Sequence, residues 1–489
     1  MQNQQFSHYR VNLHILSPIH IGTGQELDPF SYVIRGRGLF LIDLVKWMES
    51  YPEKDKLDNM MDSDNFAIIR SFIAEQFNLE SAVRCSIPVD NPNLLATYKK
   101  AIKERNPRNQ VLISPMIRNE VSMDAYIPGS SIKGAMRTAI ANRFVETAGV
   151  TKKDSRRGRY DYNVKIFGQI NKDPMRGLKI SDVPLGKSNT VVVEAKEYPL
   201  NPDKPLTPKG HMETTLSLSH TDKPFVYPLR FSLAPFKLHG AEVDPNLIVD
   251  SLYRFYVPKY EEEYSKFFQP QDSQAVQEGI IPMNKVVADL RANETLIRIG
   301  HFSHVECITL DKVRDPKTRK GRDGRPLPWG KTRTLANGIY PFGWAKLEFL
   351  DLGARPRPAK DWPFLLESRG KGGKKFVPEA PEFKASDDQV HPGVAVEEGR
   401  IEKKAPTKKV KPVEPETISP LERLIKELDL VKANDMGRIG TIIQKIDALE
   451  IDAEKGAIAK AIQDKIGPKA FKKHKRKKYL RELISKTGQ

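Results

Sequence analysis

Cysteine is almost missing from this 489-residue sequence, in which only Cys85 and Cys307 occur. Two cysteines can build neither a disulfide framework nor a cysteine-rich zinc ribbon within one chain. We therefore expect the protein to work in a reducing compartment.

Long apolar runs are missing as well. None approaches the roughly 18 apolar residues that a helix needs to cross a bilayer. Residues 1–6 are polar and rich in glutamine, unlike the apolar core of a signal peptide. We expect a cytoplasmic protein that is neither secreted nor bound in a membrane.

The sequence also lacks a Walker A loop, an H-E-x-x-H helix and a G-x-S-x-G elbow, which removes the support for ATPase, metalloprotease and hydrolase functions. His301, His304 and Cys307 have a spacing that suggests metal ligands. Their surroundings predict a strand, however, in which residues 301 and 307 point to one side and 304 to the other. We expect no bound metal and no cofactor.

Positive charge is what the sequence has in excess. Lysine and arginine number 80 against 62 aspartates and glutamates, a formal charge of +18. Such a surplus favours a polyanionic partner, with nucleic acid first among the candidates, although many basic proteins owe only their solubility to it. Two basic segments, residues 152–159 and 314–333, are either RNA-contacting loops that order on binding or solvated loops.

Alternating apolar and polar residues predict a mixed α+β fold. Residues 9–15 alternate as a strand with one buried face does, and residues 31–42 are typical of a hairpin with glycines in its turn. Asp43 is placed to cap a following helix. We expect a largely helical insertion around residues 49–110, and then the loop and helix of residues 127–146.

Extended patterns return further along the chain, at residues 231–233, 296–299 and 344–349. At about 150 residues per domain, the chain is long enough for about three folded units. We therefore divide this part of the sequence into two small α+β domains, residues 1–209 and 210–352.

The composition then changes. Residues 353–418 are rich in proline, lysine, glutamate, glycine and alanine, which predicts a linker that cannot bury a core. The Ser-Pro-Leu-Glu sequence that begins at residue 419 is typical of a helix start, and apolar residues recur after it with helical spacing. We expect residues 419–489 to form a small helical bundle with a very basic tail at 472–478.

A helix start after residue 127 combines glycines, serines and cations. One of its serines can cap the helix, whose apolar stripe runs from Ile132 to Phe144. Free N–H groups of the first turn, the positive end of the helix dipole and two cations one turn apart suit a phosphate, and glycine lets a backbone come close. The alternative is an ordinary helix start with a solvated basic face. The residues concerned are Gly129, Ser130, Ser131, Lys133 and Arg137.

A second glycine-bearing turn, with Gly22 and Gly24, follows the first strand. It can admit a ribose or a phosphate, or it can merely turn the chain. It is not a dinucleotide fingerprint, because a third glycine and a directly following helix are missing. His20 has the pKa range of a general base for metal-independent RNA cleavage, but no second His, Tyr or Lys is spaced with it in a recognisable dyad.

Aromatic residues lie beside Gly343 and Lys346. If Phe342 and Trp344 are exposed, they can stack on unpaired bases next to a basic residue. Alternatively, both rings pack in the core.

Three segments resemble, in order, those of the RAMP proteins of type III CRISPR systems, most closely the family of fifth Csm subunits of type III-A effector complexes. They are residues 16–24, 127–137 and 342–347, of which the middle one is the most specific. The resemblance covers roughly residues 6–352. Phe342 departs from the usual pattern of the third segment, and the linker and C-terminal bundle depart from typical members.

The resemblance implies tandem ferredoxin-like (RRM-type) folds. It also implies a non-catalytic subunit at the end of the complex that binds the 3′ region of the CRISPR RNA and takes part in its maturation. Its partners would be that RNA, neighbouring backbone RAMP subunits, the small helical subunit and host trimming nucleases. The residues implied in RNA contact are Gly129, Ser130, Ser131, Lys133 and Arg137, with His20, Gly22 and Gly24 nearby, and Gly343 and Lys346 from the third segment.

Two other functions stay open at this point. One is a CRISPR endoribonuclease that cuts precursor RNA with His20 as the base. The other is a scaffold whose basic character is incidental.

Overall fold

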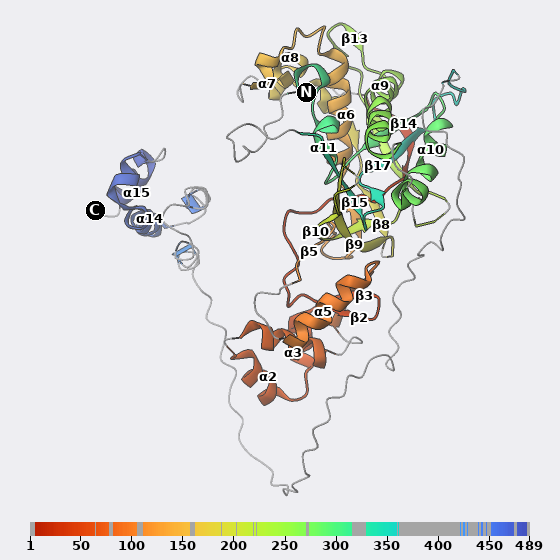
Figure 1. Cartoon of the computed structure of the whole chain (residues 1–489). Coiled ribbons are helices and arrows are strands. Elements are labelled where there is room, and N and C mark those ends of the chain that lie inside the picture. The colour runs from red at the N-terminus through yellow and green to blue at the C-terminus, as the bar shows by residue number, and fades with distance from the viewer. Residues whose placement is uncertain are drawn as a thin grey trace, which may run out of the picture. The chain divides into compact units, whose positions relative to one another are not determined.

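The computed structural model describes most of residues 5–360 and parts of residues 421–486 (Figure 1). Within these limits the residues not described are 64, 78–81, 105–110, 157–161, 187, 202, 219, 222, 270–272, 315–328, 359, 474–476 and most of 422–450. The chain divides into two compact units, residues 1–391 and 392–489, which are described separately. Most of the predicted linker, from residue 361 onward, lies outside the described residues.

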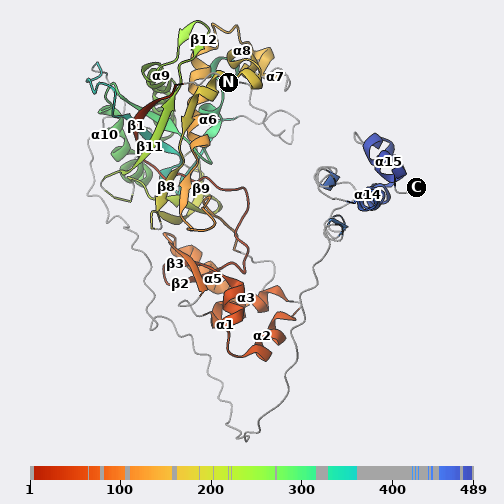
Figure 2. The ribbon, with the colours of Figure 1, turned by 180° about the vertical axis from the view of Figure 1, so that it is seen from behind.

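A five-stranded antiparallel sheet forms the centre of the first unit, in the order β14-β17-β1-β11-β7. Strand β1 pairs with β11 along its whole length and with β17 on its other side (Figure 2). The strands are β1 (Ser7–Ile15), β7 (Leu178–Ile180), β11 (Phe225–Leu233), β14 (Glu294–Arg298) and β17 (Trp344–Phe349). The strands predicted at residues 9–15, 231–233, 296–299 and 344–349 are therefore confirmed.

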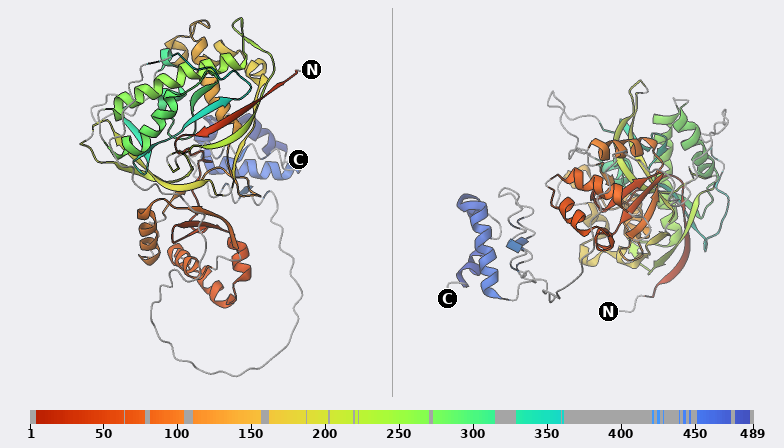
Figure 3. Two further views of the ribbon diagram at one scale, coloured as in Figure 1. Left: turned by 90° about the vertical axis from the view of Figure 1, so that its right-hand side faces the viewer. Right: turned by 90° about the horizontal axis from the view of Figure 1, so that it is seen from below.

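Two long helices cover one face of this sheet. They are α6 (Gly129–Phe144) and α9 (Pro245–Glu263), and Figure 3 shows the ribbon from two further sides. Both helices contribute to the same buried apolar cluster as the strands. In chain order the elements run β1, α6, β7, β11, α9 and β17, with β14 added at one edge. This is the βαββαβ arrangement of a ferredoxin-like fold.

The division that we predicted between residues 209 and 210 is wrong. Strand β1, from the first predicted domain, pairs with β11 and β17 from the second. Strands far apart in sequence thus share one sheet, and the two halves of the chain complete a single core. Local sequence patterns predict strands but not their partners, because pairing depends on distant residues.

The second sheet has the order β16-β15-β9-β10-β5, and it is not a second ferredoxin-like sheet. It combines two hairpins, β9–β10 and β15–β16, that lie in the chain between strands of the first sheet. Its strands are β5 (Ile113–Ser114), β9 (Thr190–Pro199), β10 (Thr207–Thr215), β15 (Thr332–Ala336) and β16 (Tyr340–Pro341). In the described residues the expected tandem arrangement is therefore replaced by one such fold and a sheet of hairpins.

The predicted insertion is partly strand. Its sheet is β2-β3-β4, and the hairpin expected at residues 31–42 is confirmed as β2 and β3. Asp43 caps the next helix, since its carboxylate accepts the Lys46 N–H. The elements are β2 (Tyr32–Arg35), β3 (Gly38–Ile42), β4 (Val83–Pro88), α1 (Leu44–Ser50), α2 (Lys54–Met61), α3 (Phe66–Gln76) and α5 (Pro92–Glu104).

Shorter elements connect these layers. They are β6 (Ala125–Ile127), β8 (Val183–Gly186), β12 (Lys237–Leu238), β13 (Ala241–Glu242), α7 (Lys152–Arg156), α8 (Tyr162–Phe167), α10 (Ile281–Ala288) and α11 (His304–Ile308). Single helical turns are η1 (Ile170–Lys172), η2 (Pro174–Gly177), η3 (Tyr264–Phe268), η4 (Ala275–Ile280) and η5 (Asp311–Val313).

Buried ion pairs fasten α9 to the edge of the first sheet. Glu263 at the end of α9 pairs with Arg298 and with Arg333, whose Nε lies 3.2 Å from the carboxylate, and all three residues are buried. Burial by itself would raise the pKa of Glu263, but the charges of Arg298 and Arg333 outweigh it and lower this pKa to about 2. The carboxylate is therefore charged at neutral pH, and it neutralises the buried Arg298 and part of the charge around Arg333.

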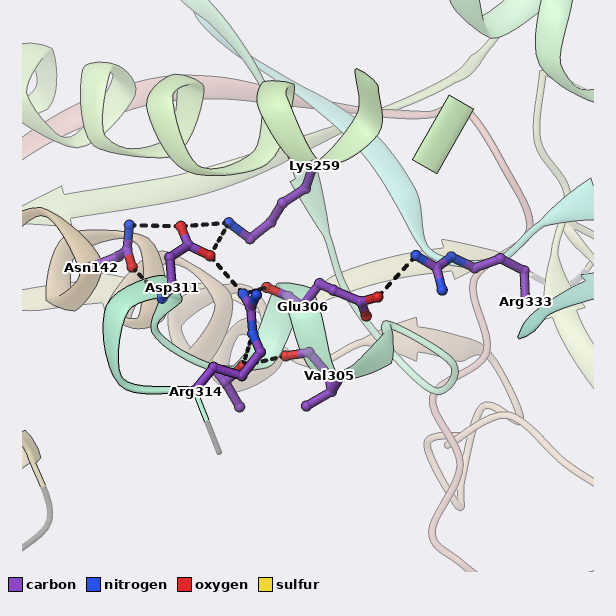
Figure 4. Close-up of polar contacts among 8 residues, drawn as sticks. Asn142, Lys259, Val305, Glu306, Asp311, Arg314 and Arg333 are labelled. Atoms are coloured by element: carbon purple, nitrogen blue, oxygen red, sulfur yellow. Dashed lines mark hydrogen bonds and ion pairs between the residues drawn. The ribbon is translucent and has the colours of Figure 1, made fainter. Parts of the chain in front are cut away.

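A second polar network joins α6, α9 and the segment after α11 (Figure 4). Asp311 accepts hydrogen bonds from the Lys259 ammonium at 2.9 Å and from the Arg314 guanidinium at 2.6 Å. Its backbone N–H donates to Asn142 on α6. Arg333 also pairs with Glu306 at 3.1 Å, which links this segment to the Glu263 pairs.

The C-terminal unit has its own apolar cluster. Its helices are α14 (Asp452–Lys473), interrupted at Gly467 where φ is 74°, and α15 (Lys477–Lys486). Isoleucines at the predicted helical spacing, including Ile442, Ile458 and Ile462, are buried in the cluster. The side chains of the basic tail at 472–478 lie outside the described residues.

Within the described part of the chain, we find no helix that combines the length and the apolar character needed to span a membrane.

Replacing Glu263 by glutamine should destabilise the first unit by about 3–5 kcal/mol, because it removes the counter-charge of the buried Arg298 and leaves the buried Arg333 with Glu306 alone. Urea unfolding followed by tryptophan fluorescence measures this, since the Arg298 guanidinium lies 4.8 Å from the Trp344 ring. The control is Asp351→Asn, which removes the exposed partner of Arg10 and should leave stability unchanged. A Glu263→Gln variant as stable as the original protein would contradict the prediction.

Candidate nucleic-acid interface

The helix start predicted after residue 127 is present, but its cap differs from the prediction. Helix α6 begins at Gly129 with Pro128 as its N-cap, so Ser130 and Ser131 lie in the first turn and neither caps the helix. The Gly129 N–H donates to the Asp182 carboxylate at 2.8 Å. This carboxylate from the β7–β8 connection already occupies the place near the helix dipole that we expected a phosphate to take.

Gly129 is required for close packing of the chain with itself. A Cβ at this residue would lie 2.2 Å from the Ile180 carbonyl oxygen and 2.7 Å from that of Ser181. The residue is buried, so it fixes the position of α6 against β7. Ser130 and Gly134 are exposed on the same helix, and Ser131 is half-buried.

The two predicted cations on α6 are half-buried and already have protein partners. The Lys133 ammonium donates to the Leu178 carbonyl at 2.6 Å. Arg137 pairs with Asp173 at 2.7 Å, and its guanidinium lies 3.7 Å from the centre of the Phe167 ring. These contacts fix both cations in place, and the remaining donors of the Lys133 ammonium stay available.

Lys179 is a cation that the sequence did not single out. It is exposed on β7, next to the strand residue that accepts the Lys133 hydrogen bond. Burial lowers the pKa of Lys133, Asp173 opposes this, and the charges of Arg137 and Lys179 lower it further. Arg137, Lys179 and Asp173 therefore all lie near Lys133, and with Asp182 at the helix start the charges of these five side chains sum to +1, a small local excess of positive charge that suits a polyanion.

His20 is buried at the end of the turn that follows β1. One ring nitrogen, Nδ1, lies 2.6 Å from the Glu213 carbonyl oxygen. Its ring meets that of His301 edge-on, with the centroids 6.1 Å apart. Burial lowers the pKa of His20, as does the neighbouring His301, although the Glu213 carbonyl opposes them.

Gly22 and Gly24 have different roles. A Cβ at Gly22 would lie 2.8 Å from Nε2 of His20 and 3.0 Å from the Pro115 carbonyl oxygen. Gly24 has a φ of +81° and open space around it, so it supplies the turn. Both glycines are exposed.

Main-chain hydrogen bonds join three distant segments at this point. The Gly343 N–H donates to the Pro18 carbonyl at 2.9 Å, and the His301 N–H donates to the His20 carbonyl at 2.8 Å. Gly343 (φ +92°) and Gly300 (φ +84°) allow this approach, since a Cβ at Gly300 would lie 2.5 Å from the His20 carbonyl oxygen. Gly343 is buried in this junction, a structural role that the sequence did not reveal.

Of the two alternatives for the aromatic rings beside Gly343, the structure shows core packing and excludes base stacking. Phe342 and Trp344 are buried, with 0% and 1% of their surfaces exposed, so they pack in the core. Lys346 is half-buried on β17, and its ammonium binds Glu294 at 2.5 Å. This third segment therefore supports the junction, and its lysine already has a counter-charge.

The turn at His20 and the start of α6 lie close together. The Ile117 N–H donates to the Ile21 carbonyl, and the Tyr126 N–H donates to the Ile117 carbonyl, at 2.8 and 3.2 Å. Tyr126 belongs to β6, which leads directly into α6. The turn and the chain before α6 are therefore separated by two spacings between hydrogen-bonded chains, each about 4.8 Å. Parts of the first two segments of the resemblance thus form one region, which we call the turn–helix region (residues 20–24 and 129–137).

The segment from His301 to Cys307 is not the strand that we expected. It is a turn followed by the short helix α11, which starts at His304. Among the described residues, no group of three histidine, cysteine or acidic side chains is arranged to hold a metal.

The two basic loops are only partly described. Residues 315–328 and 157–161 lie outside the described residues. Lys152 and Lys153 on α7 are exposed, and Arg314 is held by Asp311.

Comparisons with known proteins identify relatives. The family model described as the RAMP superfamily matches residues 12–440. A curated protein of Methanocaldococcus jannaschii, named CRISPR system Cms protein Csm5, is 26% identical over 153 residues, which are 28% of this chain and 33% of that protein. The alignment thus spans a third of the relative's length.

Two solved structures are also similar. One is a chain of a Csm–crRNA–target RNA ternary complex in a type III-A CRISPR–Cas system, with 20% identity, a TM-score of 0.48, and coverage of 70% of this chain and 100% of that chain. The other is T. onnurineus Csm5, with 19% identity, a TM-score of 0.44, and coverage of 68% and 99%.

The two glycines of α6 should respond in opposite ways to alanine. Gly129→Ala places a methyl group against two carbonyl oxygens and should cost about 1–3 kcal/mol. Gly134→Ala meets nothing within 4 Å on an exposed helix interior, so it should stabilise by roughly 0.5–1 kcal/mol. Urea unfolding of the full-length variants distinguishes these results, and equal effects of the two changes would show that Gly129 has no packing role.

Proposed function

Because the chain belongs to the RAMP superfamily, we propose that it is a Csm5-like subunit of a type III-A CRISPR effector complex. In this role it binds single-stranded CRISPR RNA along the turn–helix region. The observation that carries the proposal is the pair of main-chain hydrogen bonds that joins Ile21 to Ile117 and Ile117 to Tyr126, because it brings a glycine-bearing turn beside a helix start that carries fixed cations.

Electrostatics and shape favour RNA as the ligand. Arg137 and Lys179 are close enough to Lys133 for their charges to lower its pKa, and the positive charge of the three side chains can attract phosphates. The exposed Gly22 and Gly24 let a nucleic-acid backbone approach without a side chain in the way. A scaffold with incidental basic charge has no need for such an arrangement.

We also propose the finer role that the resemblance implies. The subunit binds the 3′ region of the CRISPR RNA at the end of the complex, limits the number of backbone RAMP subunits and leaves a defined RNA end for host nucleases to trim. It contacts the backbone RAMP subunits and the small helical subunit. It has no catalytic activity of its own.

For the C-terminal unit, residues 392–489, we propose an additional contact with RNA or with a partner subunit. Its support is the basic sequence at 472–478 beside a separate apolar core. Deleting residues 419–489 should weaken RNA binding or complex assembly, measured by titration and by purification of the complex with its RNA. Unchanged affinity, assembly and RNA length would rule the contact out.

The RNA-binding region is tested by the double variant Lys133→Ala with Arg137→Ala. If both side chains contact phosphates, the slope of log K against log salt should fall by about 1.4, since each contact to a single strand contributes about 0.7. Fluorescence anisotropy with a single-stranded RNA at several salt concentrations measures this slope.

The matched control removes two cations elsewhere, Lys56 and Lys100, which are exposed on the insertion and pair with Glu53 and Glu104. In this control variant, the slope of log K against log salt should equal that of the unchanged protein. A slope that is the same in all three proteins would refute contact at this region.

The absence of catalysis is tested with precursor RNA in the presence of a chelator. The protein should leave the RNA intact over hours. Site-specific cleavage that His20→Ala abolishes would instead support a metal-independent endoribonuclease.

A further inference from the structure

The hydrogen bond of His20 fixes which ring nitrogen carries the proton. Nδ1 lies 2.6 Å from the Glu213 carbonyl oxygen, and a carbonyl oxygen can only accept. Nδ1 must therefore be the N–H donor. In a neutral imidazole the other nitrogen, Nε2, then has a lone pair and can only accept a hydrogen bond.

The surroundings of His20 keep the ring neutral. The side chain is buried, with 5% of its surface exposed, and burial lowers its pKa below the ordinary value. The neighbouring His301 lowers this pKa further, against the effect of the Glu213 carbonyl. At neutral pH the site presents an acceptor and no positive charge.

Gly22 leaves Nε2 open. A Cβ on this exposed residue would lie 2.8 Å from Nε2, closer than such atoms pack, and would close the approach from solvent. The φ of Gly22 is not in the left-handed region, so the backbone does not require a glycine there. The missing side chain therefore matters for access to the nitrogen.

A neutral acceptor cannot bind a phosphate, because phosphate oxygens are acceptors as well. The sugar of RNA has one donor along its backbone, the 2′-hydroxyl, and DNA lacks it. We propose that Nε2 of His20 accepts a hydrogen bond from a ribose 2′-hydroxyl, so that this turn selects RNA over DNA. The inference rests on the proposed function, in which single-stranded RNA lies along the turn–helix region.

The adjoining segment, residues 300–304, packs against His20, whose ring centroid lies 6.1 Å from that of His301. His301 is exposed, and its ring centroid lies 4.1 Å from that of Phe302. Phe302 and His304 both have φ values of +60°, which side-chain-bearing residues adopt at a cost and which often mark a functional site. Gly300 fits this strained segment against the His20 carbonyl, so that the segment and His20 keep a fixed geometry.

The experiment compares single-stranded oligonucleotides of one sequence bound to the full-length protein. One is RNA, and the other carries 2′-fluoro groups, which keep an RNA-like sugar but cannot donate a hydrogen bond. The unchanged protein should bind the RNA roughly fivefold more tightly, as expected for one neutral hydrogen bond. Gly22→Ala should reduce this ratio to about one, because its methyl group would lie 2.8 Å from Nε2 and must either cover this nitrogen or displace the ring.

Gly353→Ala serves as the control, since a Cβ there meets nothing within 4 Å and the residue lies outside the turn–helix region. Its ratio should stay near fivefold. His20→Phe is a second variant that should also bring the ratio to about one.

Equal binding of RNA and 2′-fluoro RNA by the unchanged protein would overturn this inference and leave the proposed function standing. An affinity ratio that is the same in the Gly22→Ala variant as in the unchanged protein would do so too. A preference that follows base identity instead of the 2′-group would overturn it too, in favour of recognition of a base amine. Failure to bind either oligonucleotide would contradict the proposed function as well as the inference.

Discussion

The pairing of β1 with β11 on one side and β17 on the other is the constraint on which the rest of the structure depends. It joins strands that lie more than 200 residues apart, so every segment between them must leave this sheet and return to it. The segments that lie between these strands in the chain form the mixed insertion and the hairpins of the second sheet. Because β1 leads straight into the turn at His20, the same pairing places that turn beside Gly343 at the start of β17.

Glycines in the candidate region act mainly by allowing chains to touch. Gly129, Gly300 and Gly343 each bring a main chain within a distance that a Cβ would prevent, and the carbonyls that they approach belong to distant segments. Only Gly22 and Gly24 remain exposed in the turn. A motif that resembles a ligand-binding loop in the sequence therefore also serves as a structural junction. Fixed surroundings of this kind hold a binding site in one geometry.

The turn–helix region offers two kinds of contact that complement each other. Lys133 and Arg137, together with the neighbouring Lys179 on β7, supply positive charge, whose attraction for any nucleic acid weakens with salt. His20 supplies an uncharged acceptor that phosphate cannot use. Charge gives affinity and the acceptor gives selectivity, as in other nucleic-acid sites where phosphate contacts and specific contacts are separate.

The sequence by itself determined the local elements: β1, the hairpin after residue 31, α6 with its buried stripe, and β17. Their patterns depend on residues two to four positions apart, which periodicity records. Only the tertiary structure decided which strands share a sheet, that Trp344 is buried, and that Asp182 takes the place expected for a phosphate. These outcomes arise from contacts between residues far apart in the chain, and a local pattern holds no information about a distant partner.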